Sequence, residues 1–171
     1  MILDVDIQCA FEWDAMPESN LIKKWVESVL GASDVQWCRP LESGDNVACD
    51  DGGQLTIRMV DRNESAKLNS TYRHREGATN VLSFPFETPR LLTPPLLGDL
   101  IVCVPLVLSE AAQQNKQVDS HLAHLVVHGV LHLLGYDHEE DDAAQEMEHL
   151  EKKIMAQLGY PDPYMDDLKV V

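Results

Sequence analysis

The chain has 171 residues, 44% hydrophobic and 25% charged, which suits one soluble globular domain and is too short for two ordinary ones. Thirteen Lys and Arg against 29 Asp and Glu give a net charge of −16, which disfavours nucleic acids and anionic membranes as long-range partners. The most apolar stretch, Leu122–Leu134, is shorter than a membrane span of ~20 residues and is interrupted by histidines. No secretory signal is visible at the N-terminus, so we expect a cytoplasmic protein.

The cysteines stand far apart, and none forms the CxxC pair typical of zinc or redox sites. A chain of this length does not need disulfides to fold. We therefore expect four reduced, mostly buried thiols, at Cys9, Cys38, Cys49 and Cys103.

The first third of the chain predicts a strand, a helix and a long connection. Apolar and polar residues alternate over Leu3–Cys9, as in a strand with one buried face. Apolar residues recur at helical spacing over 17–30, and Gly31 favours a helix end there. Residues 32–53 have no period and are rich in turn formers, so we expect a long surface insertion.

The middle of the chain predicts three strands and a short helix. Residues 55–60 alternate as a strand, and a helix follows over 61–69, with an aspartate placed to cap it. A further strand is predicted over 80–84, where Pro85 ends it. The apolar run over 100–104 is typical of a well-buried strand.

The last part predicts three helices, over 106–114, from 119 or 120 to about 134, and over 141–158. The acidic run Glu139–Asp142 fits the first turn of the last helix, where the helix dipole stabilises acids. Early strands, late helices and two strand–helix–strand steps predict an α+β or α/β fold. We expect one domain over 1–171, with a small sheet covered by helices.

Three histidines have the spacing of a metal site. His128 and His132 are four residues apart, so a helix puts both imidazoles on one face. Gly135 can end this helix in a left-handed conformation and turn the chain back, so that His138 reaches the same point. Three imidazoles with an open fourth position are typical of a catalytic zinc site.

The alternative is that these histidines are simply polar residues on a core helix. Two imidazoles would then lie among valines and leucines without hydrogen-bond partners, which costs about 1–3 kcal/mol of stability for each unsatisfied polar atom. We therefore prefer the metal site. His121 and His124 lie nearby and could support the ligands, face a substrate or be solvated. His149 lies in an acidic helix and is expected to be solvated.

The spacing matches the metzincin metalloproteases, HExxHxxGxxH, except that Gly129 stands where those enzymes carry their glutamate base. Peptide hydrolysis on zinc normally needs that carboxylate, so ordinary proteolysis is not expected. A bound metal still activates water for a substrate that brings its own charge to be stabilised. Phosphodiesters meet this condition.

Two signatures are visible when this motif is taken with the middle of the chain. They are HGVLHLLGYDH over 128–138, and VDRNESAKLNSTYR over 60–73 followed by TNVLSFPFE over 79–87 and LGD over 97–99. Together they resemble the YbeY family of bacterial metal-dependent endoribonucleases, which act in ribosomal RNA maturation. The resemblance covers residues 55 to about 165.

The resemblance implies a zincin-like α+β metallohydrolase fold with a mixed four-stranded sheet. It implies one Zn²⁺ on His128, His132 and His138, a ligand set that other divalent transition metals also accept. Arg73 and His128 are the implied catalytic residues. The implied activity is single-strand-specific cleavage of ribosomal RNA, in maturation of the 16S rRNA 3′ end and in ribosome quality control. The implied partners are ribosomal RNA and the small subunit with its proteins, in the cytoplasm, without DNA or membrane.

Two departures from the family pattern are visible. Residues 74–78 read His-Arg-Glu-Gly-Ala where the family usually has Gly-Lys-Asp-x-Pro, which keeps the charges but loses two backbone constraints. The stretch 32–53 is longer than expected in relatives. Residues 55–75 also hold five Lys and Arg against two acids, a basic segment in an acidic chain, which favours RNA presented by another assembly.

Our mechanistic hypothesis is that the metal ion binds a water or a phosphate oxygen while Arg73 neutralises charge on the phosphoryl oxygens. Asp137 is expected to orient a ligand imidazole. Two other functions stay open. One is a zinc metalloprotease whose base is displaced to Asp137 or Glu139. The other is a non-catalytic ribosome assembly factor, with a structural metal site and an acidic surface that meets basic ribosomal proteins.

Overall fold

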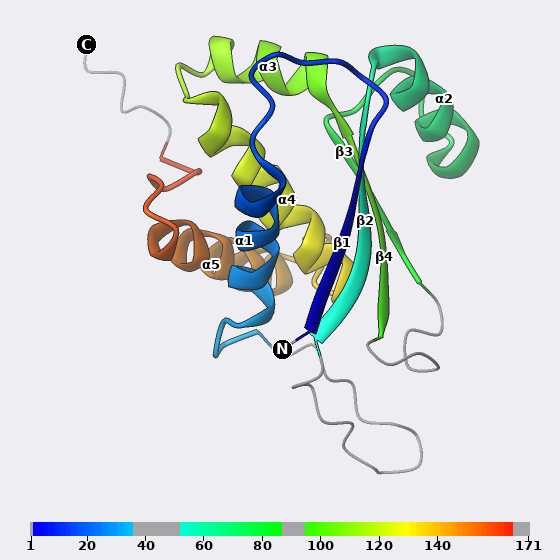
Figure 1. Cartoon of the computed structure of the whole chain (residues 1–171). Coiled ribbons are helices and arrows are strands. Elements are labelled where there is room, and N and C mark those ends of the chain that lie inside the picture. Colours follow the sequence, from blue (N-terminus) through cyan, green and yellow to red (C-terminus); the bar gives the residue numbers. More distant parts are fainter. Residues whose placement is uncertain (1, 36–51, 87–94, 166–171) are drawn as a thin grey trace.

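The structure is a computed structural model that describes residues 2–35, 52–86 and 95–165. Its strands form one sheet in the order β1-β2-β4-β3 (Figure 1). The strands are β1 (Ile2–Cys9), β2 (Gly52–Val60), β3 (Val81–Pro85) and β4 (Leu96–Cys103). β1, β2 and β4 run parallel, and β3 pairs with β4 in the antiparallel direction. The predicted α+β fold with a small mixed four-stranded sheet is therefore confirmed.

Helices cover the two faces of this sheet unequally. They are α1 (Ser19–Leu30), α2 (Arg62–Arg73), α3 (Val104–Gln113), α4 (Val118–Leu133) and α5 (Asp141–Gln157). α1, α4 and α5 lie on one face, over the larger core, and α2 lies on the other (Figure 1). No helix within the described ranges combines the length and the hydropathy that a bilayer crossing requires.

α4 is the central helix of the larger core and contacts the sheet, α1, α3 and α5. Its fully buried side chains are Leu122, Ala123, Val126, Val127, Val130 and Leu131. A helix packed on so many sides keeps only a narrow stripe near solvent, with a spacing of four residues. The half-buried residues of this stripe are His124, His128 and His132.

β3 and β4 both extend beyond their predicted ends. β4 begins at Leu96 rather than at residue 100, because Gly98 lies inside the strand and not in a turn. β3 includes Pro85, which was predicted to end it. The Phe86 N–H still donates to the Leu97 carbonyl at 3.0 Å, so the ladder continues past the proline. β3 is the last strand of the sheet order, where a proline that cannot donate is tolerated.

α2 is one turn longer than predicted and ends at Arg73 rather than at Asn69. Its buried face is fixed by two side chains that hydrogen-bond to the following loop. The Ser65 hydroxyl donates to the Thr79 carbonyl at 2.9 Å, and the Asn69 amide donates to the Gly77 carbonyl at 2.8 Å. These tertiary contacts hold a helix end whose Ser, Thr and Tyr residues are weak helix formers.

The predicted insertion over 32–53 is described only at its two ends. β2 already begins at Gly52, which pairs with Ile2 of β1, so the last two residues of this stretch belong to the sheet. Residues 36–51 lie outside the described part of the chain. The other helices begin and end close to their predicted bounds, and the acidic run before residue 143 does form the start of α5.

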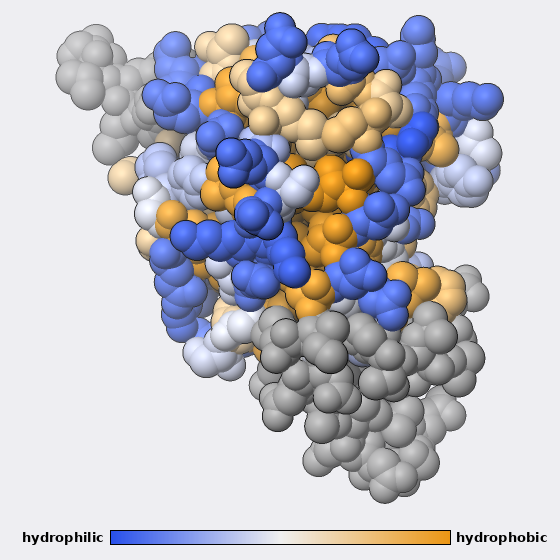
Figure 2. Space-filling view, in the orientation of Figure 1, coloured by the Kyte–Doolittle hydropathy of each residue, from blue (hydrophilic) through white to orange (hydrophobic). Residues whose placement is uncertain are grey.

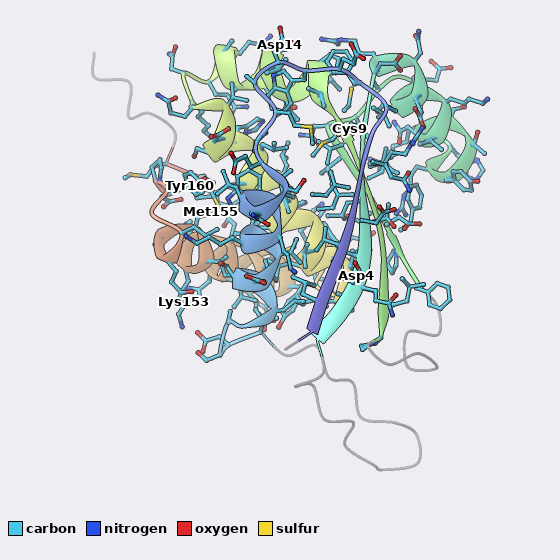
Figure 3. The ribbon with its side chains drawn as sticks, viewed as in Figure 1. Asp4, Cys9, Asp14, Lys153, Met155 and Tyr160 are labelled. Atoms are coloured by element: carbon cyan, nitrogen blue, oxygen red, sulfur yellow. The ribbon has the colours of Figure 1, made fainter. Side chains whose placement is uncertain are left out.

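The prediction of buried cysteines is wrong for Cys9. It is exposed at the end of β1, where its Sγ lies 3.1 Å from the Met16 Sδ (Figure 3). β1 is an edge strand, and Figure 2 shows apolar surface between it and α1. Cys103 is buried, as predicted, and both are free thiols. Cys38 and Cys49 lie outside the described residues.

Gly98 is a position where β4 requires glycine. Its φ is 139°, and a Cβ there would lie 2.2 Å from the Phe84 carbonyl oxygen of β3. We expect Gly98→Ala to lower the free energy of unfolding, measured by urea denaturation, by about 2–6 kcal/mol, from backbone strain plus overpacking. Gly77→Ala is the control, because its φ is 86° but nothing lies within 4 Å of its Cβ position. It should cost only about 1–2 kcal/mol, and equal losses for the two variants would contradict the packing explanation.

Candidate metal centre

His128 and His132 lie one turn apart on the half-buried stripe of α4, as the sequence predicts. Their ring centroids are 4.6 Å apart and their Nε2 atoms 3.1 Å apart. Each ring therefore directs one nitrogen toward a common point.

The end of α4 brings a third histidine to the same place. The Gly135 N–H donates to the His132 carbonyl and the Tyr136 N–H to the Leu131 carbonyl, the hydrogen bonds of a helix closed by a left-handed glycine. Gly135 has a φ of 99°, which glycine adopts without strain. The chain then turns back, and the His138 ring centroid lies 5.0 Å from that of His132 and 5.8 Å from that of His128.

The three histidines can each offer one ligand atom, and these atoms lie within 4.8 Å of one another. His128 and His132 are half-buried, whereas His138 is exposed. The site is therefore held by the core on one side and open to solvent on the other. An open side is what a catalytic metal site needs for its substrate.

Hydrogen bonds decide which nitrogens of the two helix histidines face the common point. The His128 Nδ1 lies 2.6 Å from a Glu151 carboxylate oxygen, and the His132 Nδ1 lies 2.9 Å from the Tyr136 carbonyl oxygen. An ionised carboxylate and a carbonyl only accept, so both Nδ1 atoms carry the hydrogen. In neutral rings both Nε2 atoms then present lone pairs, and at 3.1 Å these repel unless a cation lies between them.

This donor set fits a transition-metal ion. A tetrahedral site with Zn–N bonds of ~2.0–2.1 Å places two ligand nitrogens about 3.3 Å apart, close to the 3.1 Å between the two Nε2 atoms. Burial lowers the pKa of His132, and the neighbouring His128 and His138 rings lower it further. The His132 ring is therefore held in the neutral form that ligates a metal.

Glu151 of α5 orients His128, and the sequence analysis did not identify it. Its carboxylate is 1% exposed. Burial by itself raises the pKa of Glu151, but hydrogen bonds from His124 and His128 outweigh burial and lower it to about 2. The buried carboxylate is thus ionised at neutral pH. One feature of the sequence indicates that Glu151 is buried. It lies four residues from both Met147 and Met155, on the apolar stripe of α5.

His124 and Tyr164 hold this carboxylate from two other directions. The His124 Nε2 lies 3.2 Å from the carboxylate oxygen that His128 contacts, and the Tyr164 hydroxyl donates to the second oxygen at 2.5 Å. Burial and the Glu151 charge raise the pKa of Tyr164, so its phenol stays protonated and donates. Of the three roles left open for His124, the structure favours support of a ligand. His149 is exposed, as predicted.

His121 does not join this cluster. Its ring is buried, and within the described ranges neither ring nitrogen has a hydrogen-bond partner. The Glu110 carboxylate lies 3.6 Å from its Nε2. Burial lowers the pKa of His121 and keeps the ring neutral. With His124, it lines a cavity of about 460 Å³ between the start of α4 and residues 161–165.

Asp137 makes a different contact from the one expected. Its Oδ1 accepts from the His138 backbone N–H at 2.6 Å, so it fixes the main chain of the third histidine rather than a ring. The orienting role expected of Asp137 is filled by Glu151 for His128 and by the backbone for His132.

Arg73 lies at the end of α2, exposed, beside the open edge of β3. Its guanidinium donates to the Ser83 carbonyl and lies 5.3 Å from the Phe84 ring centroid. The Ser83 hydroxyl donates in turn to the Gly129 carbonyl at 3.3 Å. No hydrogen bond or ring contact within the described residues joins Arg73 to the three histidines. Arg73 is connected to the neighbourhood of His128 indirectly, through the hydrogen bonds of Ser83 on β3.

Gly129 allows α4 to approach the sheet. A Cβ at this position would lie 2.8 Å from the Leu100 Cδ2 and 3.4 Å from the Ser83 Oγ. A glutamate side chain here would therefore start toward β4 and β3, which already fill that space. Gly129, at the position of the metzincin glutamate, therefore serves close packing of α4 on the sheet.

We expect Glu151→Gln to weaken metal binding by about 10- to 100-fold, because the neutral amide no longer holds the His128 Nδ1–H as firmly. The measurement is competition with a chromogenic chelator for added Zn²⁺. Glu146→Gln, an exposed carboxylate on the same helix, is the matched control and should bind as tightly as the wild type. Equal affinity for all three proteins would contradict the orienting role.

Comparisons with known proteins identify the family of this chain. The family model described as Endoribonuclease YbeY matches residues 14–159. Proteins named Endoribonuclease YbeY from Pseudomonas putida and Pseudomonas entomophila are 49% and 48% identical over 167 residues, which cover 97% of this chain and 96% of each relative. The solution structure of TM1509 from Thermotoga maritima has a similar fold, with a TM-score of 0.52 and 22% identity over 92% of both chains. The chain belongs to the YbeY endoribonuclease family.

Proposed function

We propose that this protein is a zinc-dependent endoribonuclease that cleaves single-stranded RNA at the site formed by His128, His132 and His138. The observation that supports this most directly is the 3.1 Å approach of two Nε2 atoms whose Nδ1 partners are both acceptors. The exposed side of the site, at His138, leaves room for a large substrate. When bound there, a divalent ion supplies Lewis-acid stabilisation of the charge on a phosphoryl oxygen.

The residues of the chain have separate roles in this proposal. His128 and His132 direct their Nε2 atoms to the common point because Glu151 and the Tyr136 carbonyl hold their Nδ1–H groups. Arg73 provides the positive charge that stabilises the phosphoryl oxygens in the transition state. Its guanidinium has five N–H donors and uses one on Ser83, so others are free for phosphate.

The proposed substrate is ribosomal RNA near the 3′ end of 16S rRNA, presented in the cytoplasm by the small ribosomal subunit. The net charge of −16 supports presentation by a partner, because such a chain attracts free RNA weakly. Once the RNA is delivered, the basic residues of α2 and the following turn attract it locally.

The structure argues against a protease at position 129. This position is a glycine packed on Leu100, and a glutamate there would require the Leu100 side chain to shift.

The test is cleavage of a single-stranded 16S 3′-end fragment by the metal-loaded protein. DNA of the same sequence, a fully paired RNA duplex and casein serve as competing substrates. We expect only the single-stranded RNA to be cut, and chelator to stop the cutting. Inactivity on this RNA, alone and within small subunits, with a full metal site would contradict the proposal and favour the assembly-factor alternative.

A further inference from the structure

Tyr72, which is exposed, and Phe84 of β3, which is half-buried, form an aromatic surface that we name the aromatic ledge. Tyr72 is 62% exposed, and its ring packs edge-to-face on Phe84, with centroids 5.4 Å apart and planes at 70°. Phe84 itself packs against the small hydrophobic cluster on the α2 side of the sheet. The ledge is therefore a rigid base that carries a ring open to solvent.

Phe86, one residue beyond the end of β3, is a second exposed ring in this part of the chain. The Phe86 N–H is held by the Leu97 carbonyl, and the side chain is 41% exposed. Exposed rings such as those of Tyr72 and Phe86 offer flat apolar faces, which single-stranded nucleic acids use as stacking platforms.

Positive charge is concentrated on the segment that carries Tyr72. Residues 62–75 hold four Lys and Arg and a single acid, Glu64, which is paired with Arg58 of β2 at 2.7 Å. No described acid forms an ion pair with the four cations, which are Arg62, Lys67, Arg73 and Arg75. A chain of net charge −16 therefore gathers four cations on the segment that carries Tyr72, and Arg73 among them contacts the Phe84 ring.

The ledge and α4 lie on opposite sides of the same edge strand. Phe84 faces the α2 side, whereas the Ser83 hydroxyl faces α4 and contacts the Gly129 carbonyl, one residue after His128. Arg73 reaches the edge between them, with its guanidinium on both Ser83 and Phe84. A flexible chain that crosses this edge can touch the ledge, Arg73 and the histidine site in turn.

We propose that the aromatic ledge binds the single-stranded RNA substrate, with a base stacked on the exposed Tyr72 ring and phosphates held by the cations of α2 and the turn after it. This inference rests on the proposed endoribonuclease function and adds the surface that selects unpaired bases. A paired duplex cannot offer base faces to these rings, so the ledge accounts for a preference for single strands. The free cations favour a polyanion over an apolar protein surface as the occupant.

The test is binding of a fluorescent eight-nucleotide oligoadenylate and of an abasic ribose-phosphate chain with the same number of phosphates. Both probes are checked by gel to be intact after the measurement. The wild type should bind the oligoadenylate more tightly. Tyr72→Ala should bind it about 5- to 150-fold more weakly and bind the abasic chain unchanged, whereas Tyr72→Phe should behave as the wild type. Met165→Ala, which truncates a 59% exposed side chain elsewhere, is the matched control.

Equal oligoadenylate binding by wild type and Tyr72→Ala would overturn the ledge, even if the wild type still cleaves RNA. Loss of affinity for both probes together would overturn it as well, because charge alone would then explain binding. If Tyr72→Ala instead loses only the binding of RNA-free small-subunit proteins, the ledge is a protein contact. Absence of cleavage with intact, base-dependent binding would refute the proposed function but not the ledge.

Discussion

His128→Ala is expected to lose metal binding and RNA cleavage together, with activity reduced by at least ~100-fold. The substitution removes one of three imidazole ligands and leaves two on neighbouring elements, which do not hold a divalent ion firmly. It also deprives the buried Glu151 carboxylate of its shortest hydrogen bond from a histidine. The measurements are metal content after dialysis and cleavage of the single-stranded fragment.

His138→Ala separates metal loss from unfolding. His138 is exposed, so its removal should leave the melting temperature near that of the wild type while metal and activity are lost. His149→Ala is the matched control, because it removes an exposed histidine of α5 and should change neither. Full zinc occupancy in His138→Ala or His128→Ala would show that the ligand set is assigned incorrectly.

Arg73→Ala is expected to lower kcat for RNA cleavage by about 10²- to 10³-fold while metal content stays at the wild-type level. The guanidinium is the cation linked to α4 through the Ser83 backbone and hydroxyl, and no histidine depends on it for its hydrogen bonds. Loss of its bond to Ser83 should cost about 1 kcal/mol of stability, which a thermal melt separates from the loss of activity.

Two further variants sharpen this test. Arg73→Lys keeps the charge but not the planar fork, so it should recover only part of the activity. Lys24→Ala removes one exposed positive charge from α1, far from the site in sequence, and should leave kcat unchanged. Wild-type kcat in Arg73→Ala would remove Arg73 from the mechanism.

Much of the histidine geometry could be predicted because it is local. The spacing of His128 and His132 fixes two rings on one helix face, and a left-handed Gly135 is enough to return the chain to His138. These relations depend on helix periodicity and on one turn, both of which are written in consecutive residues.

Glu151 could not be assigned a role in the same way because it reaches His128 from another helix. In the sequence it is one acid among many in the segment that forms α5. Its partners His124, His128 and Tyr164 belong to segments that meet it only when α4 and α5 pack. The one local indication was that Glu151 lies on the apolar stripe of α5. Burying a carboxylate there costs free energy unless hydrogen-bond partners hold it.

The strand ends that sequence reasoning misplaced share one physical cause. Gly98 and Pro85 are turn formers in isolation, yet they face each other across β3 and β4. The glycine admits the close approach of the Phe84 carbonyl, and the proline lies on the edge strand where a missing donor is tolerated. Pairing between strands decides these positions, and pairing is not visible in one segment alone.

The most direct test of the central claim is metal reconstitution. The protein is stripped with chelator, Zn²⁺ is added back in steps, and cleavage of single-stranded RNA is plotted against bound metal per chain. The three-histidine site predicts no cleavage without metal and a linear rise that ends at one ion per chain, absent in His138→Ala. Cleavage by the stripped protein, or activity that does not follow occupancy, would contradict the account.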